Sequence, residues 1–401
     1  MTALRAGSIA CAFAAFAVWP GAVAADDRSI AIGLDLPLSG IDGASAIPVR
    51  NAVMLAIEDA NRHGVPGGYR FTLEDLDDSV QGKHDPAQGA QNLKSFVSDP
   101  SVLVALGPMN SNVAKAEIPI SNAAGLAQIT MAATAIELTH APDAVKLRPA
   151  NPDRPAFFRV CASDDRQGAA AAAFAREQGL KAAFVIDDNE SYGKGLADVF
   201  AASFAGDHGT VIGREHLTPF ALDFKALLTK VRATNPDVVF FGGIVSTGGA
   251  LLRRQMADVG LGGVPYFGGD GLEGPDYLPL AGKAGDGTFF TFASPNIERL
   301  PAAIAFAKAY HARFGTAPGS YSPGGYAAAA VAIGAIEAAL RAHPDQMPSR
   351  DEVLTGIAGT AGLVTPVGSI SFDRQGDLRH PVISLYRIRA GQVEFVRQAG
   401  V

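Results

Sequence analysis

Small polar residues and one carboxylate follow the predicted strands of this chain, where open α/β sheets bind their ligands. Ser111 follows the apolar stretch 102–106, Thr134 follows 126–130, and Asp270 follows Tyr266-Phe267. Hydroxyls and N–H groups at a helix start can hold a carboxylate, and a buried aspartate can hold an ammonium through a strong charge-assisted pair. Any single hydroxyl could equally cap a helix or shape a turn, but the set favours binding over nucleophilic catalysis.

Motifs typical of enzymes are weak or missing in the sequence. The stretch 269–274 matches the glycine spacing of a dinucleotide site, but such a site needs a helix behind the glycines, and Pro275 and Pro279 interrupt one. No P-loop or G-x-S-x-G stretch occurs, and the eight histidines lack the spacing of metal ligands. The pairs Asp77-Asp78 and Asp187-Asp188 could bind a metal, but adjacent acids at strand ends are more typical of a solvated edge. We therefore expect no enzyme, no cofactor and no metal site.

The charge balance excludes two classes of partner. The 401 residues include 33 Lys and Arg against 40 Asp and Glu, which gives a formal net charge of −7. A negative chain without basic clusters lacks the electrostatic footprint of a protein that binds nucleic acid or an anionic membrane. Cys161 is the only cysteine after the N-terminal segment, so no intramolecular disulfide is expected there, and its apolar neighbours predict a buried, inert thiol.

The N-terminus has the three parts of a secretory signal. Arg5 precedes an apolar run over residues 8–19, and the small residues 22–25 follow. The apolar run is shorter than the ~20 residues that a membrane span needs. We therefore predict that residues 1–25 are a signal peptide, cleaved after Ala24 or Ala25, and that the protein is exported to the periplasm.

The remaining chain alternates apolar strand patterns with helical patterns, which indicates parallel sheets built from βαβ units. The predicted strands are 30–36, 69–75, 102–106, 126–130, 182–186, 238–241, 266–267 and 288–292. The predicted helices between them are 50–62, 86–97, 112–124, 167–178, 193–205, 224–233 and 248–259. The last section predicts helices 302–314, 324–342 and 351–358, then antiparallel strands 369–372, 382–388 and 393–396, the first two joined by a turn at 373–377. No polar linker separates the two halves, which favours lobes that share several crossings.

Short motifs over nearly all of this chain resemble the branched-chain amino-acid-binding proteins of ABC importers, which belong to the type I periplasmic binding proteins. Their order and spacing carry the resemblance, and they are Leu38-Ser39-Gly40, Ala132-Ala133-Thr134-Ala135, Asp164-Asp165-Arg166-Gln167-Gly168, Tyr192-Gly193-Lys194-Gly195-Leu196, Asp223-Phe224 and the stretch 368–377. The resemblance implies two Rossmann-like α/β lobes joined by three hinge crossings, which close around a ligand as periplasmic binding proteins do.

The resemblance also implies boundaries for these lobes. Residues 26–162 and 292–365 would form the N-terminal lobe, and residues 163–291 and 366–401 the C-terminal lobe. The chain would cross between them near Cys161–Asp164, Thr291–Ser294 and Thr365–Gly368. A small ligand and an inner-membrane ABC permease are the implied partners, and the implied state is a monomer.

By position, the resemblance implies a ligand site that includes Ser111, Ala132, Thr134, Tyr192, Asp270 and Tyr321. The two hydroxyls and the backbone of Ala132 would hold the ligand carboxylate, Asp270 would pair with the α-ammonium, and the two tyrosines would form opposite walls.

Three further positions in the implied site depart from the leucine-binding members. Ser45 and Ile244 stand where those members carry aromatic residues, and Asn110 replaces one cysteine of a pair. Asp270 is also shorter than their glutamate. The departures leave open which amino-acid-like compound binds, since related members bind amides, urea or aromatic acids. The alternative function is a ligand-sensing receptor of the same fold for such compounds.

Overall fold

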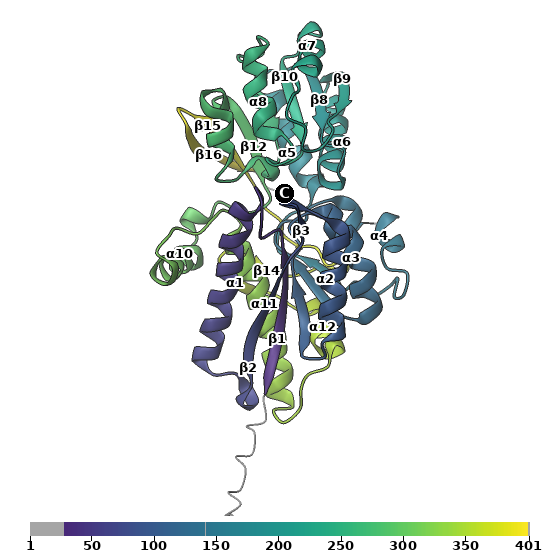
Figure 1. Cartoon of the computed structure of the whole chain (residues 1–401), viewed down its shortest axis with the longest axis vertical. Coiled ribbons are helices and arrows are strands. Elements are labelled where there is room, and N and C mark those ends of the chain that lie inside the picture. The colour runs from purple at the N-terminus through teal and green to yellow at the C-terminus, as the bar shows by residue number, and fades with distance from the viewer. Residues whose placement is uncertain (1–27, 141, 400–401) are drawn as a thin grey trace, which may run out of the picture.

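Two β-sheets organise the chain in the computed structural model, which describes residues 28–140 and 142–399 (Figure 1). The first sheet is parallel throughout, with strand order β2-β1-β5-β6-β7. Its strands are β1 (Ser29–Leu36), β2 (Arg70–Asp77), β5 (Val102–Leu106), β6 (Ala127–Thr130) and β7 (Phe157–Arg159). The predicted signal peptide lies outside the described residues.

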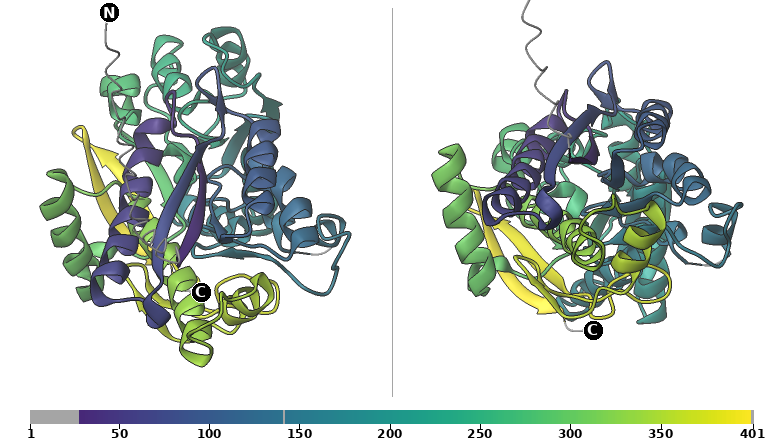
Figure 2. Two further views of the ribbon diagram at one scale, coloured as in Figure 1. Left: turned by 60° about the horizontal axis from the view of Figure 1, so that its bottom comes forward. Right: turned by 90° about the horizontal axis from the view of Figure 1, so that it is seen from below.

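Helices pack around the first sheet, and they include three from the last third of the chain. These helices are α1 (Gly43–His63), α2 (Pro86–Ser98), α3 (Ser111–Ala124), α4 (Asp143–Lys146), α10 (Pro301–Phe314), α11 (Ser322–Ala342) and α12 (Arg350–Ala358). Helix α11 packs against both α1 and α12 (Figure 2). Among the described residues, α11 alone is long and apolar enough to cross a membrane, but most of its apolar window is buried in the first core. It is therefore a core helix of this lobe.

The second sheet combines five parallel strands with an antiparallel hairpin from the C-terminus, in the order β16-β15-β12-β11-β10-β8-β9. Its strands are β8 (Ala182–Asp187), β9 (Thr210–His216), β10 (Val238–Gly242), β11 (Tyr266–Gly268), β12 (Thr288–Phe292), β15 (Ile383–Arg389) and β16 (Gln392–Ala399). Its helices are α5 (Asp164–Glu177), α6 (Ser191–Gly206), α7 (Lys225–Ala233), α8 (Gly249–Asp258) and α9 (Tyr277–Ala281). In Figure 1 this sheet lies above the first one.

Short elements complete the fold. Two small hairpins pair β3 (Ser79–Val80) with β4 (Lys83–His84), and β13 (Leu363–Thr365) with β14 (Gly368–Ile370). The single-turn 3₁₀ helices are η1 (Pro66–Gly68), η2 (Ile136–Leu138), η3 (Asp270–Leu272), η4 (Gly282–Gly285) and η5 (Ile297–Arg299).

The parallel strands of each sheet reverse their order at one point, between β1 and β5 in the first sheet and between β8 and β10 in the second. Crevices form beyond the carboxyl ends of strands at such switch points, and ligands bind there. The segments that follow these four strands all point toward the boundary between the two sheets, where they contribute Pro37, Asn110, Asp188 and Ile244 to one cleft.

Three crossings between the two sheets meet in a small apolar cluster formed by Cys161, Ala162, Ala293 and Ile383. The backbone N–H of Ala162 donates to the carbonyl of Ala293 at 2.9 Å, so the first two crossings lie side by side. Cys161 is 4% exposed, and burial raises the pKa of its thiol, in agreement with the expected inert cysteine.

The third crossing differs from the expectation at Thr365–Gly368. Strand β14 pairs with β13 instead of β15, and Ile370 and Phe372 are buried in the first core. Phe372 packs its ring against Phe158 with 5.1 Å between the ring centroids. Because these apolar side chains are buried in the first core, residues 366–378 lie with the first sheet. The chain crosses to the second sheet only just before Ile383. The predicted antiparallel pairing of 369–372 with 382–388 is therefore wrong.

Candidate functional site

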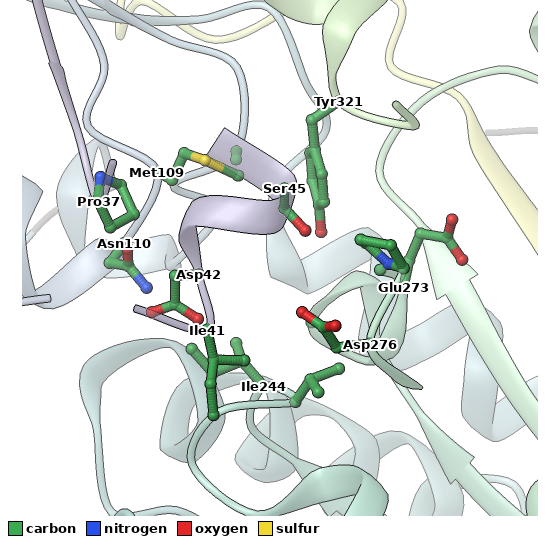
Figure 3. Close-up of a pocket in the computed structure, with 15 residues that line it drawn as sticks. Pro37, Ile41, Asp42, Ser45, Met109, Asn110, Ile244, Glu273, Asp276 and Tyr321 are labelled. Carbon is green, nitrogen blue, oxygen red and sulfur yellow. The ribbon is translucent and has the colours of Figure 1, made fainter. Parts of the chain in front are cut away.

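The cleft between the two sheets is lined by segments of both (Figure 3). It holds about 540 Å³ of empty space, a volume that includes open solvent at its mouth. The first sheet side contributes Pro37, Ile41, Asp42, Ser45, Met109, Asn110, Ala132 and Tyr321. The second contributes Ile244, Val245, Gly271, Glu273, Gly274, Pro275 and Asp276. An inner part of the same cleft reaches Ser111, Asp188, Tyr192 and Asp270.

Eight of the nine residues implied by the resemblance line this cleft. The outer part holds Ser45, Asn110, Ala132, Ile244 and Tyr321, and the inner part adds Ser111, Tyr192 and Asp270. Thr134 is fully buried behind it, and its hydroxyl makes no hydrogen bond among the described residues. Ser111 is 2% exposed, and its hydroxyl accepts from the N–H of Ala135 at 3.2 Å. The roles of both hydroxyls toward a ligand stay predictions.

Asp270 is a buried carboxylate surrounded by neutral donors. It begins η3 directly after β11 and is 3% exposed. The hydroxyl of Tyr192 donates to its Oδ1 at 2.8 Å, and Nε2 of Gln167 donates to the same oxygen at 2.9 Å. Burial raises the pKa of Asp270 to about 6, although these hydrogen bonds oppose the shift. Its described hydrogen-bond partners include no cation.

A second buried carboxylate, Asp164, lies next to Asp270. It begins α5 and is fully buried, and the Gln167 amide also donates to its Oδ1 at 3.0 Å. Burial and the nearby charge of Asp270 raise the pKa of Asp164 to about 8. The carbonyl oxygen of Gln167 accepts from Thr291 at 3.0 Å, which fixes the amide between the two acids. Sequence reasoning quoted Asp164 and Gln167 within a motif but assigned neither to the site.

The glycine-rich stretch 269–274 packs closely around Tyr192. A Cβ at Gly269 would lie 2.5 Å from the Tyr192 hydroxyl, and one at Gly271 would lie 2.5 Å from the carbonyl of Gly243. Only a single 3₁₀ turn follows these glycines before Glu273, and α9 has five residues. The stretch therefore shapes the floor of the cleft, and it does not present the long helix that a dinucleotide site requires.

The two acidic pairs at strand ends are mostly buried, so their interpretation as solvated edges is wrong. Asp78, Asp187 and Asp188 are at most 1% exposed. Asp187 is paired with Arg214 at 2.7 Å and with His216 at 2.7 Å. The Arg214 guanidinium explains how β8 can end in the buried acid Asp187. Among the described residues, no group of three or more His, Cys, Asp or Glu is arranged to hold a metal ion.

Direct contacts hold the two sides of the cleft together. The Tyr321 hydroxyl donates to the carbonyl of Asp270 at 2.7 Å. The ring of His84 is fully buried, with its Nδ1 2.9 Å from Asp42 and its Nε2 2.9 Å from Glu190, on the opposite side. Both ring nitrogens therefore face carboxylate oxygens, which only the imidazolium can satisfy as a double donor. Burial alone would lower the pKa of His84, but the two carboxylates raise it to about 10.

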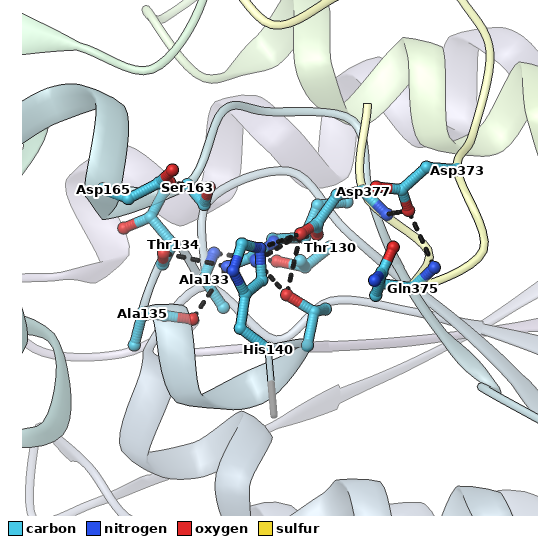
Figure 4. Close-up of polar contacts among 12 residues, drawn as sticks. Thr130, Ala133, Thr134, Ala135, His140, Ser163, Asp165, Asp373, Gln375 and Asp377 are labelled. Atoms are coloured by element: carbon cyan, nitrogen blue, oxygen red, sulfur yellow. Dashed lines mark hydrogen bonds and ion pairs between the residues drawn. The ribbon is translucent and has the colours of Figure 1, made fainter. Parts of the chain in front are cut away.

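A different buried acid, Asp377, anchors the loop behind the cleft (Figure 4). Arg159, which is fully buried, donates to both of its carboxylate oxygens at 2.7 and 3.0 Å, and to the carbonyls of Thr134 and Ala135 at 2.8 Å each. Thr139 and His140 contact the same carboxylate at 2.8 and 2.9 Å. Burial by itself would raise the pKa of Asp377, but Arg159 and these hydrogen bonds hold it well below its usual range.

Comparisons with known proteins agree with this architecture. A family model described as periplasmic binding protein matches residues 29–392. The Leu/Ile/Val-binding protein BraC3 of Rhizobium johnstonii is 32% identical over 368 residues, which cover 91% of this chain and 93% of that protein. The leucine binding protein LivK of Thermotoga maritima superposes with a TM-score of 0.80 at 25% identity, covering 92% of this chain and 99% of that one.

A more distant solved structure shares the fold alone. A solute binding protein from R. palustris in complex with benzoate has a TM-score of 0.78 at 20% identity, covering 93% of this chain and 96% of that one. One protein with this fold thus has an aromatic acid bound.

Proposed function

This chain belongs to the periplasmic binding protein family, and on that premise we propose that it is the solute-binding component of an ABC importer for a small amino-acid-like zwitterion. The family implies a periplasmic location, for which the predicted signal peptide would provide the export route. BraC3 is a Leu/Ile/Val-binding protein and LivK a leucine binding protein, which supports an amino acid as the class of ligand.

The environment of Asp270 carries this proposal. A carboxylate that is 3% exposed and contacted by a hydroxyl and an amide lacks the positive partner that buried charges require. The α-ammonium of an amino acid would supply that partner from within the cleft. The neighbouring acid Asp164, whose pKa is raised to about 8, is mostly neutral at pH 7, so the negative charge at this point rests on Asp270.

The other end of the ligand would meet the start of α3. This helix begins at Ser111, beside the cleft, and the N–H groups of a helix start attract an anion. A ligand carboxylate at the helix start would thus lie across the cleft from Asp270, and the ligand would bridge the two lobes.

Bridging gives the mechanism its physical basis. A ligand that contacts both lobes stabilises the closed arrangement and not the open one, so it shifts the equilibrium by that difference. We propose residues 28–162 and 294–380 as one lobe and residues 163–293 and 381–399 as the other, with the Cys161–Ala293–Ile383 cluster as the hinge. The closed pair of lobes would then present one surface to a membrane permease.

Calorimetry with L-leucine, L-isoleucine and benzoate tests the proposal on the purified protein. Asp270→Ala should weaken binding of any amino acid by roughly 3–5 kcal/mol, because it leaves the bound ammonium buried and unpaired. Asp153→Asn is the matched control, since Asp153 is exposed and has no described side-chain partner. Unchanged amino-acid affinity in the Asp270 variant would contradict the zwitterion site.

A further inference from the structure

The outer part of the cleft is acidic on both sides. Asp42 lines it from the first lobe, and Glu273 and Asp276 line it from the second, while no Lys or Arg occurs among the described lining residues. Figure 3 shows the carboxylates of Asp42 and Asp276 on opposite sides of the open space, with Ser45 and Tyr321 nearby. The Glu273 carboxylate points away from this space and accepts a hydrogen bond from Ser320.

Asp276 differs from the other two acids because its carboxylate has no partner among the described residues. Its carboxylate is partly exposed and forms no hydrogen bond or ion pair with any described residue. Asp42 differs, because it shares the imidazolium of His84 with Glu190. The His84 cation therefore neutralises only one of the two carboxylates, Asp42 and Glu190. This side of the cleft keeps a net negative charge, to which Asp276 adds another.

The space between these carboxylates and Asp270 lies where a ligand side chain would extend. Ser45 and Ile244 border it, and the short side chain of Ser45 leaves the approach to Asp276 open. A purely apolar ligand side chain would displace water from the Asp276 carboxylate without offering it a hydrogen-bond donor. Burying an unpaired carboxylate in this way is unfavourable. An anionic ligand without an ammonium would face Asp270 and Asp276 with no positive group of its own.

Resting on the proposed function, we infer that this cleft selects a zwitterion whose side chain ends in a cation, of the lysine, ornithine or arginine class. The α-ammonium binds at Asp270, and the terminal cation reaches the Asp276 side of the mouth. The site thereby differs in charge from one built for a branched aliphatic side chain.

L-Lysine and L-norleucine form the sharpest pair of probes, because they share a backbone and a four-carbon side chain and differ in the terminal ammonium. Calorimetry on the wild-type chain should give an affinity for L-lysine or L-arginine at least about tenfold higher than for L-norleucine, as expected for one added charge pair. Asp276→Asn should remove about tenfold of the affinity for the basic amino acid and should not lower that for L-norleucine, because a neutral amide costs less to desolvate than a carboxylate. Asp153→Asn, an exposed acid outside the cleft, should change neither.

Two other outcomes separate the inference from its premise. If L-norleucine or L-leucine binds as tightly as both basic amino acids, the inference is overturned and the amino-acid-binding function stands. An Asp276→Asn variant that loses no preference for the basic amino acid overturns it as well. If no α-amino acid binds to the wild-type protein, the proposed function itself fails, and the inference fails with it.

Discussion

Asp377 and Asp270 are two buried aspartates of one chain with opposite environments. Asp377 is 8% exposed and receives two hydrogen bonds from the Arg159 guanidinium, with Thr139 and His140 beside them. Asp270 is 3% exposed and receives only neutral donors. The pKa of the first is held low by its cation, and the pKa of the second is raised to about 6 by burial.

The difference separates a structural ion pair from a binding site. Asp377 has its positive partner within the chain, so its charge fastens the 134–135 loop to the C-terminal segment. Asp270 lacks such a partner and opens onto the cleft, as expected of a group whose partner arrives with the ligand. Asp270 thus differs from Asp377 in two respects, because it has no cationic partner among the described residues and it opens onto the cleft.

Removing Asp377 should have the largest effect on folding. Asp377→Ala leaves the fully buried Arg159 without its counter-charge, and the free energy of unfolding should fall by roughly 3–5 kcal/mol. Urea denaturation followed by circular dichroism measures this change, with Asp153→Asn as the exposed control. A loss of less than ~1 kcal/mol would show that the pair is not the anchor its geometry indicates.

Asp270→Asn should act on folding in the opposite direction. The substitution removes a buried charge that has no cation, so the unliganded protein should keep its stability or gain about 1–2 kcal/mol. The same urea experiment without ligand measures it, and Asp377→Asn under identical conditions provides the contrast. Equal destabilisation of the two variants would contradict the distinction between Asp377 as a structural ion pair and Asp270 as an unpaired binding group.

His84 offers an intermediate case, because its carboxylate partners lie on different lobes. His84→Gln should weaken binding of the tightest amino-acid ligand by about 1 kcal/mol, or roughly fivefold, since the closed state loses a charged bridge. The folded-state pKa of about 10 lies above the usual value of 6.5, so the stabilisation that the bridge provides is complete below pH 6.5 and is lost as the pH rises through 10. Wild-type affinity, measured by calorimetry, should therefore fall from pH 7 to pH 9 more steeply than that of the variant, and deprotonation of the ligand ammonium at still higher pH should weaken binding to both proteins.

The pH dependence of stability should reflect the unpaired acids. The pKa values of Asp270 and Asp164 rise from 3.8 to about 6 and about 8, so the folded state binds more protons than the unfolded one in that window. Unliganded stability should fall as the pH rises from 5 to 8, by up to about 1.4 kcal/mol per pH unit for each proton involved. Asp377 works the other way, because its low pKa gives stability that is lost only below about pH 4. Thermal melts of the wild type and Asp270→Asn should show a shallower slope in the variant.

The alternation of apolar strands and helices predicted most strands of both parallel sheets, because strands such as β5 and β10 are buried on both faces and read as continuous apolar runs. Strand β9 was not predicted, since it lies at the sheet edge and is only partly buried. The start of α1 was not predictable in this way. The helix begins at Gly43 and includes Pro48, whereas a proline in a helix interior usually marks a boundary. The third crossing was misplaced because local pattern cannot tell which core covers Ile370 and Phe372.

The lining of the cleft was predictable where a residue lies in the turn after a strand, as Asp270 and Asn110 do. His84, Glu190 and Gln167 were missed, because their contacts join residues 106 and 103 positions apart in the sequence. An acid at a helix start, such as Asp164, was the one local signal that could have indicated a further site residue. The absence of a cation beside Asp270 is a property of the assembled structure and has no counterpart in the linear sequence.

The position of Cys161 makes its thiol a natural probe of the motion between the two lobes. This thiol sits where the three crossings touch, and Ala293 and Ile383 shield it from water. Any rotation of one lobe against the other must move the crossings at these residues. The rate at which a thiol reagent modifies Cys161 should therefore follow the fraction of time that the crossings are separated. A saturating ligand should slow that modification, and the unmodified natural sequence is sufficient to observe it.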